Sequence, residues 1–176
     1  MSANETVNKV LTVLAVSGSA YFAGFTASTS ILMIPVLPLA PAPLAAKQWA
    51  KMYAIGVQLA PGMGLLPGLL FAYLAWANDA GSLAPRGVAF ALAGLFAGSN
   101  VPWTLSTMVS TNKALQAIAD EPAATTAEIE KDSVKKEKRE EEVKRLVGAW
   151  QTLNALRGFW PVIGTLIGGA VAVGLI

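Results

Sequence analysis

Residues 10–46 read VLTVLAVSGSAYFAGFTASTSILMIPVLPLAPAPLAA, a stretch of 37 residues without one charged side chain. Because a helix rises about 1.5 Å per residue, roughly 20 apolar residues cross the hydrocarbon core of a bilayer. Three further uncharged stretches, each close to or above this length, occupy residues 52–78, 87–112 and 158–176. The four stretches predict four membrane-spanning helices, near residues 8–34, 52–76, 87–112 and 150–175.

The composition of the whole chain favours the same fold class. Of its 176 residues, 54% are hydrophobic and only 14% are charged, and the mean hydropathy is +0.52. Four such stretches buried in a soluble fold would leave almost no polar residues for its surface. A cleaved signal peptide explains the first stretch poorly, because the stretch is too long and lacks a basic front. We predict a single all-α domain over residues 1–176, an integral membrane four-helix bundle in the lipid bilayer.

The chain contains no histidine and no cysteine. This excludes disulfides, iron–sulfur clusters and thiol catalysis, and it removes the usual ligands of haem, zinc and non-haem iron. The net charge of +2 is too small to indicate a nucleic-acid partner, since most charges fall in one segment. We therefore expect chemistry that does without metal-binding side chains and thiols. Self-association into a homo-oligomer is left open.

Residues 120–145 differ sharply from the rest, because more than half of them are Asp, Glu, Lys or Arg. Several opposite charges stand four residues apart, the spacing that supports a solvated helix. These pairs are Asp132 with Lys136, Glu140 with Lys144, and Glu141 with Arg145. We predict a charged extramembrane helical insert at 120–148 that runs without a break into the fourth span. A polar helix projecting from the membrane explains the insert, and a docking arm is the alternative.

Helix-breaking residues mark the other connections. Prolines at 35, 38, 41 and 43 predict an extended, polyproline-like segment after the first span. A short turn at 78–85 makes spans two and three antiparallel neighbours. Prolines and glycines at 61–68 predict that span two is broken at its centre. In the hydrocarbon core, irregular backbone is tolerated only where it borders protein or a cavity. We therefore expect a pocket between the helices there.

Lysine and arginine are distributed unevenly between the two ends of the predicted bundle. The end with the first and third connections carries Lys47, Lys51, Lys113 and the charged segment, whereas the other end carries only Lys9 and Arg86. By the positive-inside rule the segment 120–148 is cytosolic and both termini face away from the cytosol.

Polar side chains inside the spans are the best functional evidence, because they are costly in hydrocarbon unless paired. In span three, Pro102 predicts a kink beside Asn100. The helical spacing of Thr104, Met108, Thr111 and Asn112 puts these four side chains on one face.

In span four, Trp150, Asn154 and Arg157 also share a face. If spans three and four are antiparallel neighbours, Asn112, Asn154 and Arg157 converge. A purely structural role is the alternative for each residue. The asparagines could bond to neighbouring helices, and the arginine could reach the lipid headgroups.

Three motifs resemble a known family. They are Asn100-x-Pro102-x-Thr104, Thr111-Asn112-x-x-Leu115, and Trp150-x-x-Leu153-Asn154-x-x-Arg157 followed by Pro161 and Gly164. Together with the four spans and the charged insert, they resemble the integral-membrane anthrone oxygenases of fungal aromatic-polyketide pathways. The resemblance implies oxidation of a flat polyketide anthrone to an anthraquinone by O2, with no metal, flavin or other cofactor. It also implies a membrane of the endoplasmic reticulum or another endomembrane.

On this resemblance, Arg157 stabilises the anthranolate oxygen with the help of Asn112 and Asn154. Trp103 and Trp150 clamp the rings. The remaining substrate-binding candidates are Asn100, Thr104, Met108 and Thr111.

The general base is left open. The candidates are Tyr21, Tyr53, Tyr73, Asp120, Glu121 and a bound water. The competing interpretation is a non-catalytic four-helix membrane protein that binds or presents a hydrophobic metabolite, or that scaffolds pathway enzymes.

Overall fold

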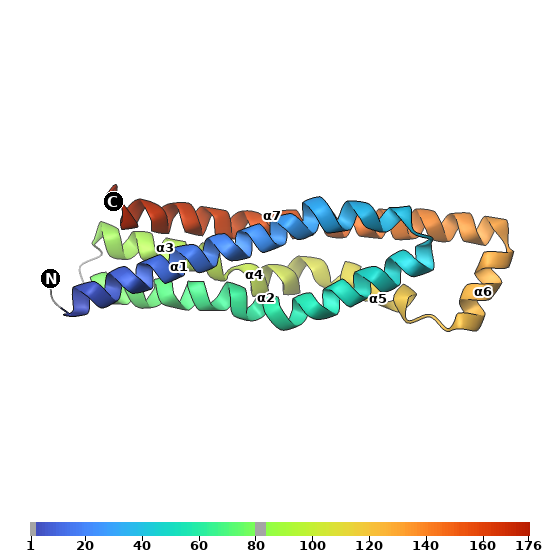
Figure 1. Cartoon of the computed structure of the whole chain (residues 1–176), viewed down its shortest axis with the longest axis horizontal. Coiled ribbons are helices and arrows are strands. Elements are labelled where there is room, and N and C mark those ends of the chain that lie inside the picture. The colour runs from blue at the N-terminus through green and yellow to red at the C-terminus, as the bar shows by residue number, and fades with distance from the viewer. Residues whose placement is uncertain (1–2, 80–83) are drawn as a thin grey trace.

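The computed structural model describes residues 3–79 and 84–176, and all regular structure in them is helical. The predicted turn at 78–85 falls mainly on residues 80–83, outside the described residues. Figure 1 shows the elements along the chain. They are α1 (Ala3–Ser28), π-helix η1 (Thr29–Met33), 3-10 helix η2 (Ile34–Leu39), α2 (Ala42–Asp79), α3 (Pro85–Gly98), α4 (Asn100–Trp103), π-helix η3 (Thr104–Met108), α5 (Val109–Ala119), α6 (Ala123–Lys131) and α7 (Ser133–Ala172).

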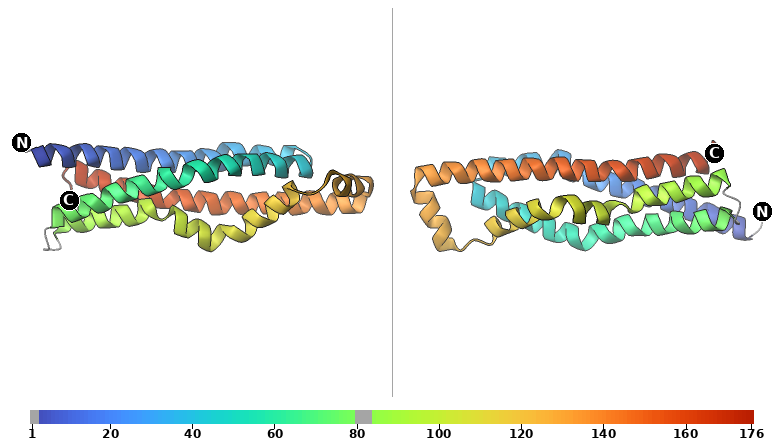
Figure 2. Two further views of the ribbon diagram at one scale, coloured as in Figure 1. Left: turned by 90° about the horizontal axis from the view of Figure 1, so that it is seen from below. Right: turned by 180° about the vertical axis from the view of Figure 1, so that it is seen from behind.

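These elements join into four rods, each long and apolar enough to cross a membrane. The rods are Asn4–Leu39, Ala42–Asn78, Pro85–Ala119 and Ser133–Ala172. Figures 1 and 2 show the rods side by side, with α6 at one end and the C-terminus at the other. Large apolar side chains such as Leu69, Leu95 and Leu166 are exposed on the outside, as lipid contact requires. The predicted all-α membrane four-helix bundle is confirmed.

The connection after the first span differs from the prediction. Residues Ile34–Leu39 form a 3-10 helix, and Ala40, with φ −93° and ψ 154°, is extended. Pro35 stands at the start of this short helix, where its fixed φ is compatible with helical backbone. The prolines therefore shape a tight helical connector here, and the polyproline-like expectation was wrong.

The second span is not broken. Helix α2 continues through Pro61 and Pro67 and changes direction near its middle instead (Figure 1). Gly68 serves close packing, because a Cβ there would lie 3.0 Å from the Cα of Gly98 on α3. The expected interruption was wrong, since each proline removes one backbone donor and the rest of the helix remains bonded.

The third span is interrupted where the sequence predicts. Helix α3 ends at Gly98, Ser99 forms a turn, and α4 begins at Asn100. The π-helix Thr104–Met108 follows directly and was not predicted. In Figure 2 this part of the rod bows away from its neighbours.

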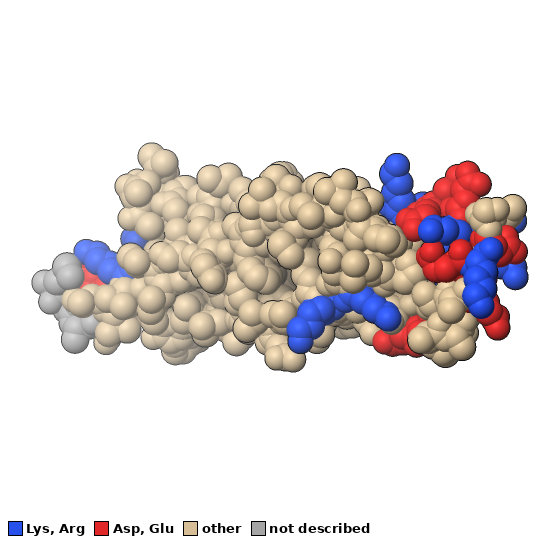
Figure 3. Space-filling model, turned by 45° about the vertical axis from the view of Figure 1, so that its right-hand side comes forward, with Lys and Arg blue, Asp and Glu red and all other residues tan. Residues whose placement is uncertain are grey.

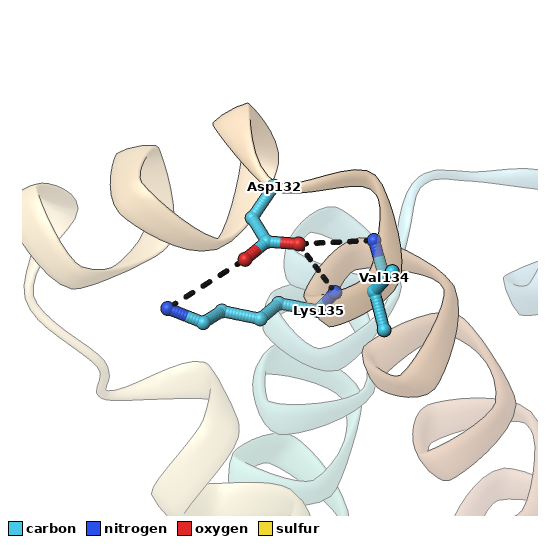
Figure 4. A network of polar contacts seen from close by, with 3 residues as sticks. All are labelled: Asp132, Val134 and Lys135. Atoms are coloured by element: carbon cyan, nitrogen blue, oxygen red, sulfur yellow. Dashed lines mark hydrogen bonds and ion pairs between the residues drawn. The ribbon is translucent and has the colours of Figure 1, made fainter.

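The charged segment folds as two helices, α6 and the first turns of α7. The side chain of Asp132 caps α7 by accepting hydrogen bonds from the amides of Val134 (3.0 Å) and Lys135 (3.2 Å), as Figure 4 shows. Helix α7 then runs unbroken for 40 residues into the fourth span, as predicted. The expectation of one continuous helix over the insert was wrong, because extended backbone at Asp132 separates α6 from α7.

Ion pairs tie the charged segment together. They join Lys136 to Glu130 and Arg139 to Glu121, at 2.8 Å and 2.7 Å, rather than the pairs expected from the spacing. Figure 3 shows the charge gathered at this end of the molecule.

Two apolar cores fill the bundle, one toward each end. The core near the charged segment contains Trp49, Leu115 and Trp150, and the other contains Phe71 and Phe90. Three of the four rods also bury polar side chains, such as Ser30 on the first, Asn100 on the third and Asn154 on the fourth.

Candidate active site

A cavity of about 200 Å³ lies between the two apolar cores. All four rods contribute to its wall, which is mostly apolar. The lining residues are Phe25, Thr29, Met52, Tyr53, Gly56, Val57, Ala60, Pro61, Asn100, Val101, Thr104, Leu105, Trp150 and Arg157. Both π-helices reach it, through Thr29 and through Thr104 and Leu105. Single wide turns of this kind recur at functional sites because they redirect side chains without ending the helix.

Arg157 faces this cavity from α7. Its Nη1 donates to Oγ1 of Thr104 at 3.2 Å, and its Nη2 donates to Oδ1 of Asn154. The Nε donor is buried and has no partner in the described part of the chain. Arg157 is thus held inside the bundle, and its guanidinium retains unused donor capacity at the cavity.

Asn154 holds the guanidinium in place. The side chain is fully buried, and its Nδ2 donates to the carbonyl of Thr26 (3.1 Å) and to Oγ of Ser30 (2.7 Å). Both donors of the amide are therefore used on the first rod, and Oδ1 must face Arg157. Asn154 does not line the cavity, so it acts on the site by orienting Arg157.

Asn112 belongs to a different network. Its Oδ1 accepts from Nε1 of Trp150 at 2.9 Å, and its Nδ2 donates to the hydroxyl of Tyr53 at 3.2 Å. The expected convergence of Asn112 with Asn154 and Arg157 is therefore only partial. Asn112 reaches the cavity through Tyr53 and Trp150, which both line it.

Asn100 presents an unsatisfied acceptor. The side chain is 3% exposed, and its Nδ2 points to the carbonyl of Ala60 at 3.4 Å, while Oδ1 has no partner among the described groups. Among the described residues three buried side-chain polar atoms lack partners, and two of them, Asn100 Oδ1 and Arg157 Nε, belong to cavity-lining residues. Since orphaned buried polar atoms are rare in folded proteins, these two atoms are candidates for contact with a polar ligand.

Three other predicted residues do not line this cavity: Trp103, Met108 and Thr111. Trp103 donates its indole N–H to the carbonyl of Leu153 at 3.2 Å, and Met108 is buried in the core near the charged segment. The shared face expected for Thr104 and Met108 assumed 3.6 residues per turn. The π-helix over Thr104–Met108 shifts the register, so later residues such as Thr111 no longer share the face of Thr104.

Most candidates for the general base do not line the cavity. Tyr21 is 69% exposed, Asp120 accepts from Gln116, and Glu121 is paired with Arg139. Tyr73 lines a separate surface depression near the other end of the bundle. Of the candidate side chains, Tyr53 alone lines the cavity.

The first rod supplies site residues that the sequence analysis did not single out. Thr26, Thr29 and Ser30 place polar groups near Asn154 and the cavity. Their spacing of three and four residues is the pattern of one helix face, and it is the sequence feature that would have identified them.

A family model described as "Anthrone oxygenase" matches residues 49–167, well over half of the chain and most of the cavity wall. The chain belongs to the anthrone oxygenase family. It is 32% identical over 158 residues to a noranthrone monooxygenase from Aspergillus flavus, with 88% of the chain and 70% of that relative covered. It is also 32% identical over 156 residues to the anthrone oxygenase AgnL2 of Paecilomyces divaricatus, with 87% and 88% covered.

A third relative covers almost the whole of both sequences. This is the anthrone oxygenase tpcL of Aspergillus fumigatus, 26% identical over 170 residues, with 96% of each chain covered. No solved structure matches the chain.

In this member of the anthrone oxygenase family, the site offers one cation, several hydroxyl and amide groups, and apolar walls. No carboxylate lines the cavity, and the described residues contain no group of three His, Cys, Asp or Glu side chains that could hold a metal ion. The arrangement suits a flat apolar molecule with a few oxygen atoms, one of which becomes negatively charged.

Proposed function

We propose that the chain catalyses the O2-dependent oxidation of an anthrone to an anthraquinone, with the reaction at the cavity beside Arg157. The names of its relatives support the reaction class. The observation that carries the site is a guanidinium with a free buried N–H beside a mostly apolar cavity. Such a donor stabilises an oxyanion that develops in a dry site.

The chemistry balances without further reactants. Loss of one methylene proton converts the anthrone to its anthranolate, whose negative charge is concentrated on the former ketone oxygen. The anthranolate gives electrons to O2, a C–O bond forms at the former methylene carbon, and a hydroperoxide results after protonation. The O–O bond then breaks as the second methylene proton leaves, and the products are the anthraquinone and one water. The oxidation therefore needs no redox cofactor, and molecular oxygen is the co-substrate.

Arg157 has the direct role in this proposal, because it faces the cavity and donates to the oxyanion. Asn154 fixes the guanidinium, and Thr104 holds its other nitrogen. Trp150, Tyr53 and Phe25 supply the aromatic walls for the rings. Trp103, Met108 and Thr111 then act through packing of the surrounding helices. The base that removes the methylene proton is not assigned.

Asn100 gives the site a preference among anthrones. Its free Oδ1 accepts a hydrogen bond from a phenolic hydroxyl, so a hydroxylated anthrone satisfies it and an unsubstituted one does not. In an Asn100→Leu variant we expect kcat/KM for 1,8-dihydroxyanthrone, relative to unsubstituted anthrone, to fall about tenfold, the equivalent of one hydrogen bond.

The matched control for Asn100→Leu is Ser99→Ala, because the hydroxyl of Ser99 bonds to the carbonyl of Phe96 and does not line the cavity. An unchanged ratio of the two kcat/KM values in Asn100→Leu would show that Asn100 does not recognise the hydroxyl group.

A protein that only binds or presents the metabolite would use the same cavity. Purified protein in lipid nanodiscs distinguishes the two functions when anthraquinone formation is compared with spontaneous oxidation in empty nanodiscs. An enzyme gives an initial rate proportional to protein concentration. A rate equal to the background, for every hydroxylated anthrone tested, would leave only the binding function.

We also propose that the protein resides in an endomembrane with the charged segment 120–148 in the cytosol. The absence of native cysteine makes single-cysteine labelling direct. In sealed microsomes, a membrane-impermeant maleimide is expected to label Thr125→Cys on α6 at once. Leu175→Cys, at the opposite end, is expected to react only after permeabilisation. The reverse pattern would mean that the lysine and arginine distribution misleads here.

A further inference from the structure

A chain of hydrogen bonds links three side chains at the cavity wall. Nε1 of Trp150 donates to Oδ1 of Asn112 at 2.9 Å, and Nδ2 of Asn112 donates to the hydroxyl oxygen of Tyr53 at 3.2 Å. Trp150 and Tyr53 line the cavity, whereas Asn112 is buried behind them, 5% exposed. The chain therefore ends at the Tyr53 hydroxyl, at the cavity surface.

The direction of every bond in this chain is determined by its first member. An indole N–H can only donate, so the atom of Asn112 that it meets must be the carbonyl oxygen. The other end of the amide is then the NH2 group, which also can only donate. Tyr53 must accept that bond through a lone pair. Its own hydroxyl hydrogen is left over, and within the described part of the chain no acceptor receives it.

The ring of Tyr53 is also fixed, by packing against aromatic neighbours. It stacks on Trp49, with ring centroids 4.9 Å apart and an interplanar angle of 11°. Trp49 in turn meets Trp150 edge-on at 6.0 Å and is completely buried. Two contacts on different sides of Tyr53 therefore fix where its free hydrogen can point.

We propose that Tyr53 is a second hydrogen-bond donor of the cavity, alongside Arg157, and that Asn112 is the positioning residue that sets its polarity. Tyr53 donates to an oxygen of the bound tricycle, which places the rings between the aromatic wall and the guanidinium. In this arrangement Tyr53 keeps its proton, so it is not the base that removes the methylene proton. The inference rests on the proposed function for the identity of the ligand.

Two variants test the polarity separately from the packing. Tyr53→Phe keeps the ring on Trp49 and removes the donor. Asn112→Asp keeps the shape and, in its ionised form, offers only acceptors, so the hydroxyl of Tyr53 turns toward residue 112 and its hydrogen leaves the cavity. Tyr73→Phe is the control, because Tyr73 lies outside the cavity.

The readouts are the Kd of 1,8-dihydroxyanthraquinone, followed by its visible absorbance, and the kcat for 1,8-dihydroxyanthrone. We expect each variant to weaken binding about tenfold, and to lower kcat between about tenfold and a hundredfold. The double variant is expected to be no worse than Tyr53→Phe alone, since both changes remove the same bond. Tyr73→Phe is expected to match the wild type.

Unchanged binding and turnover in Tyr53→Phe would overturn the inference, and this variant decides alone if Asn112→Asp fails to fold. Wild-type behaviour of Asn112→Asp beside a defective Tyr53→Phe would overturn the assigned polarity. If the wild type binds the anthraquinone but oxidises no anthrone, the proposed function fails, and weaker binding in the two variants still supports the donor.

Discussion

An Arg157→Met variant is expected to oxidise anthrones at least about a hundredfold more slowly than the wild type. Removing a single oxyanion donor from a dry site typically costs a factor of about 10² to 10³ in kcat. Arg157 is the only cation lining the cavity in the described residues, and its Nε has no other partner there. The measurement is the initial rate of anthraquinone formation in nanodiscs, with the spontaneous rate subtracted.

Two further variants make the loss at Arg157 interpretable. Arg145→Met, on an exposed turn of the same helix, removes an equal charge and is expected to leave kcat unchanged. Arg157→Lys keeps the charge without the fork of donors that bonds to Asn154 and Thr104, so a partial loss is expected. Full activity in Arg157→Met, with the fold retained by circular dichroism, would remove Arg157 from the mechanism.

A Gly164→Ala variant is expected to lose about 1–3 kcal/mol of unfolding free energy, the usual cost of overpacking. A Cβ at this position would lie 2.8 Å from the carbonyl oxygen of Ala93 and 3.0 Å from the amide of Ala97. Both are backbone atoms of α3, so no side chain can rotate away, and α3 and α7 must separate. The measurement is the loss of helicity on thermal or detergent unfolding.

Gly169→Ala is the matched control on the same helix. Nothing lies within 4 Å of a Cβ there, so stability is expected to stay level or to rise slightly because alanine favours helix more than glycine. Equal stability of Gly164→Ala and the wild type would contradict the close packing of α3 on α7.

Most of the architecture could be predicted, because membrane spans depend on length and apolarity, which are local properties of the chain. Charge spacing alone located the four rods, and the sequence also predicted the continuity of the fourth span with the charged helix before it. The bounds were less accurate. Helix α2 begins at Ala42 rather than near residue 52, because exposed Lys47 and Lys51 do not interrupt a helix that buries Trp49 on its other face.

The π-helices explain most of what the sequence analysis missed. Neither Thr29–Met33 nor Thr104–Met108 carries a residue type that specifies a wide turn. A face worked out at 3.6 residues per turn loses register across such a turn, so it does not extend from Thr104 to Thr111.

Within a single regular helix the spacing was sufficient. Arg157 and Asn154, three residues apart on α7, meet as expected. The place of Tyr53 in the site could not be predicted, because it depends on which residues of α2 face α5. No local sequence pattern determines that register. The polar residues Thr26, Thr29 and Ser30 of the first rod could have been recognised from their spacing, but they lie outside the motifs that carried the family resemblance.

The central claim is that this cavity favours the ionised form of an anthrone, and titration of the bound ligand under strictly anaerobic conditions measures this directly. Without O2 no turnover occurs, and the anthranolate is followed by its visible absorbance in nanodiscs as the pH is raised. We predict that bound 1,8-dihydroxyanthrone ionises at a lower pH in the wild type than in empty nanodiscs, and that Arg157→Met abolishes most of this shift. Ionisation at the same or a higher pH in the wild-type protein would contradict the account.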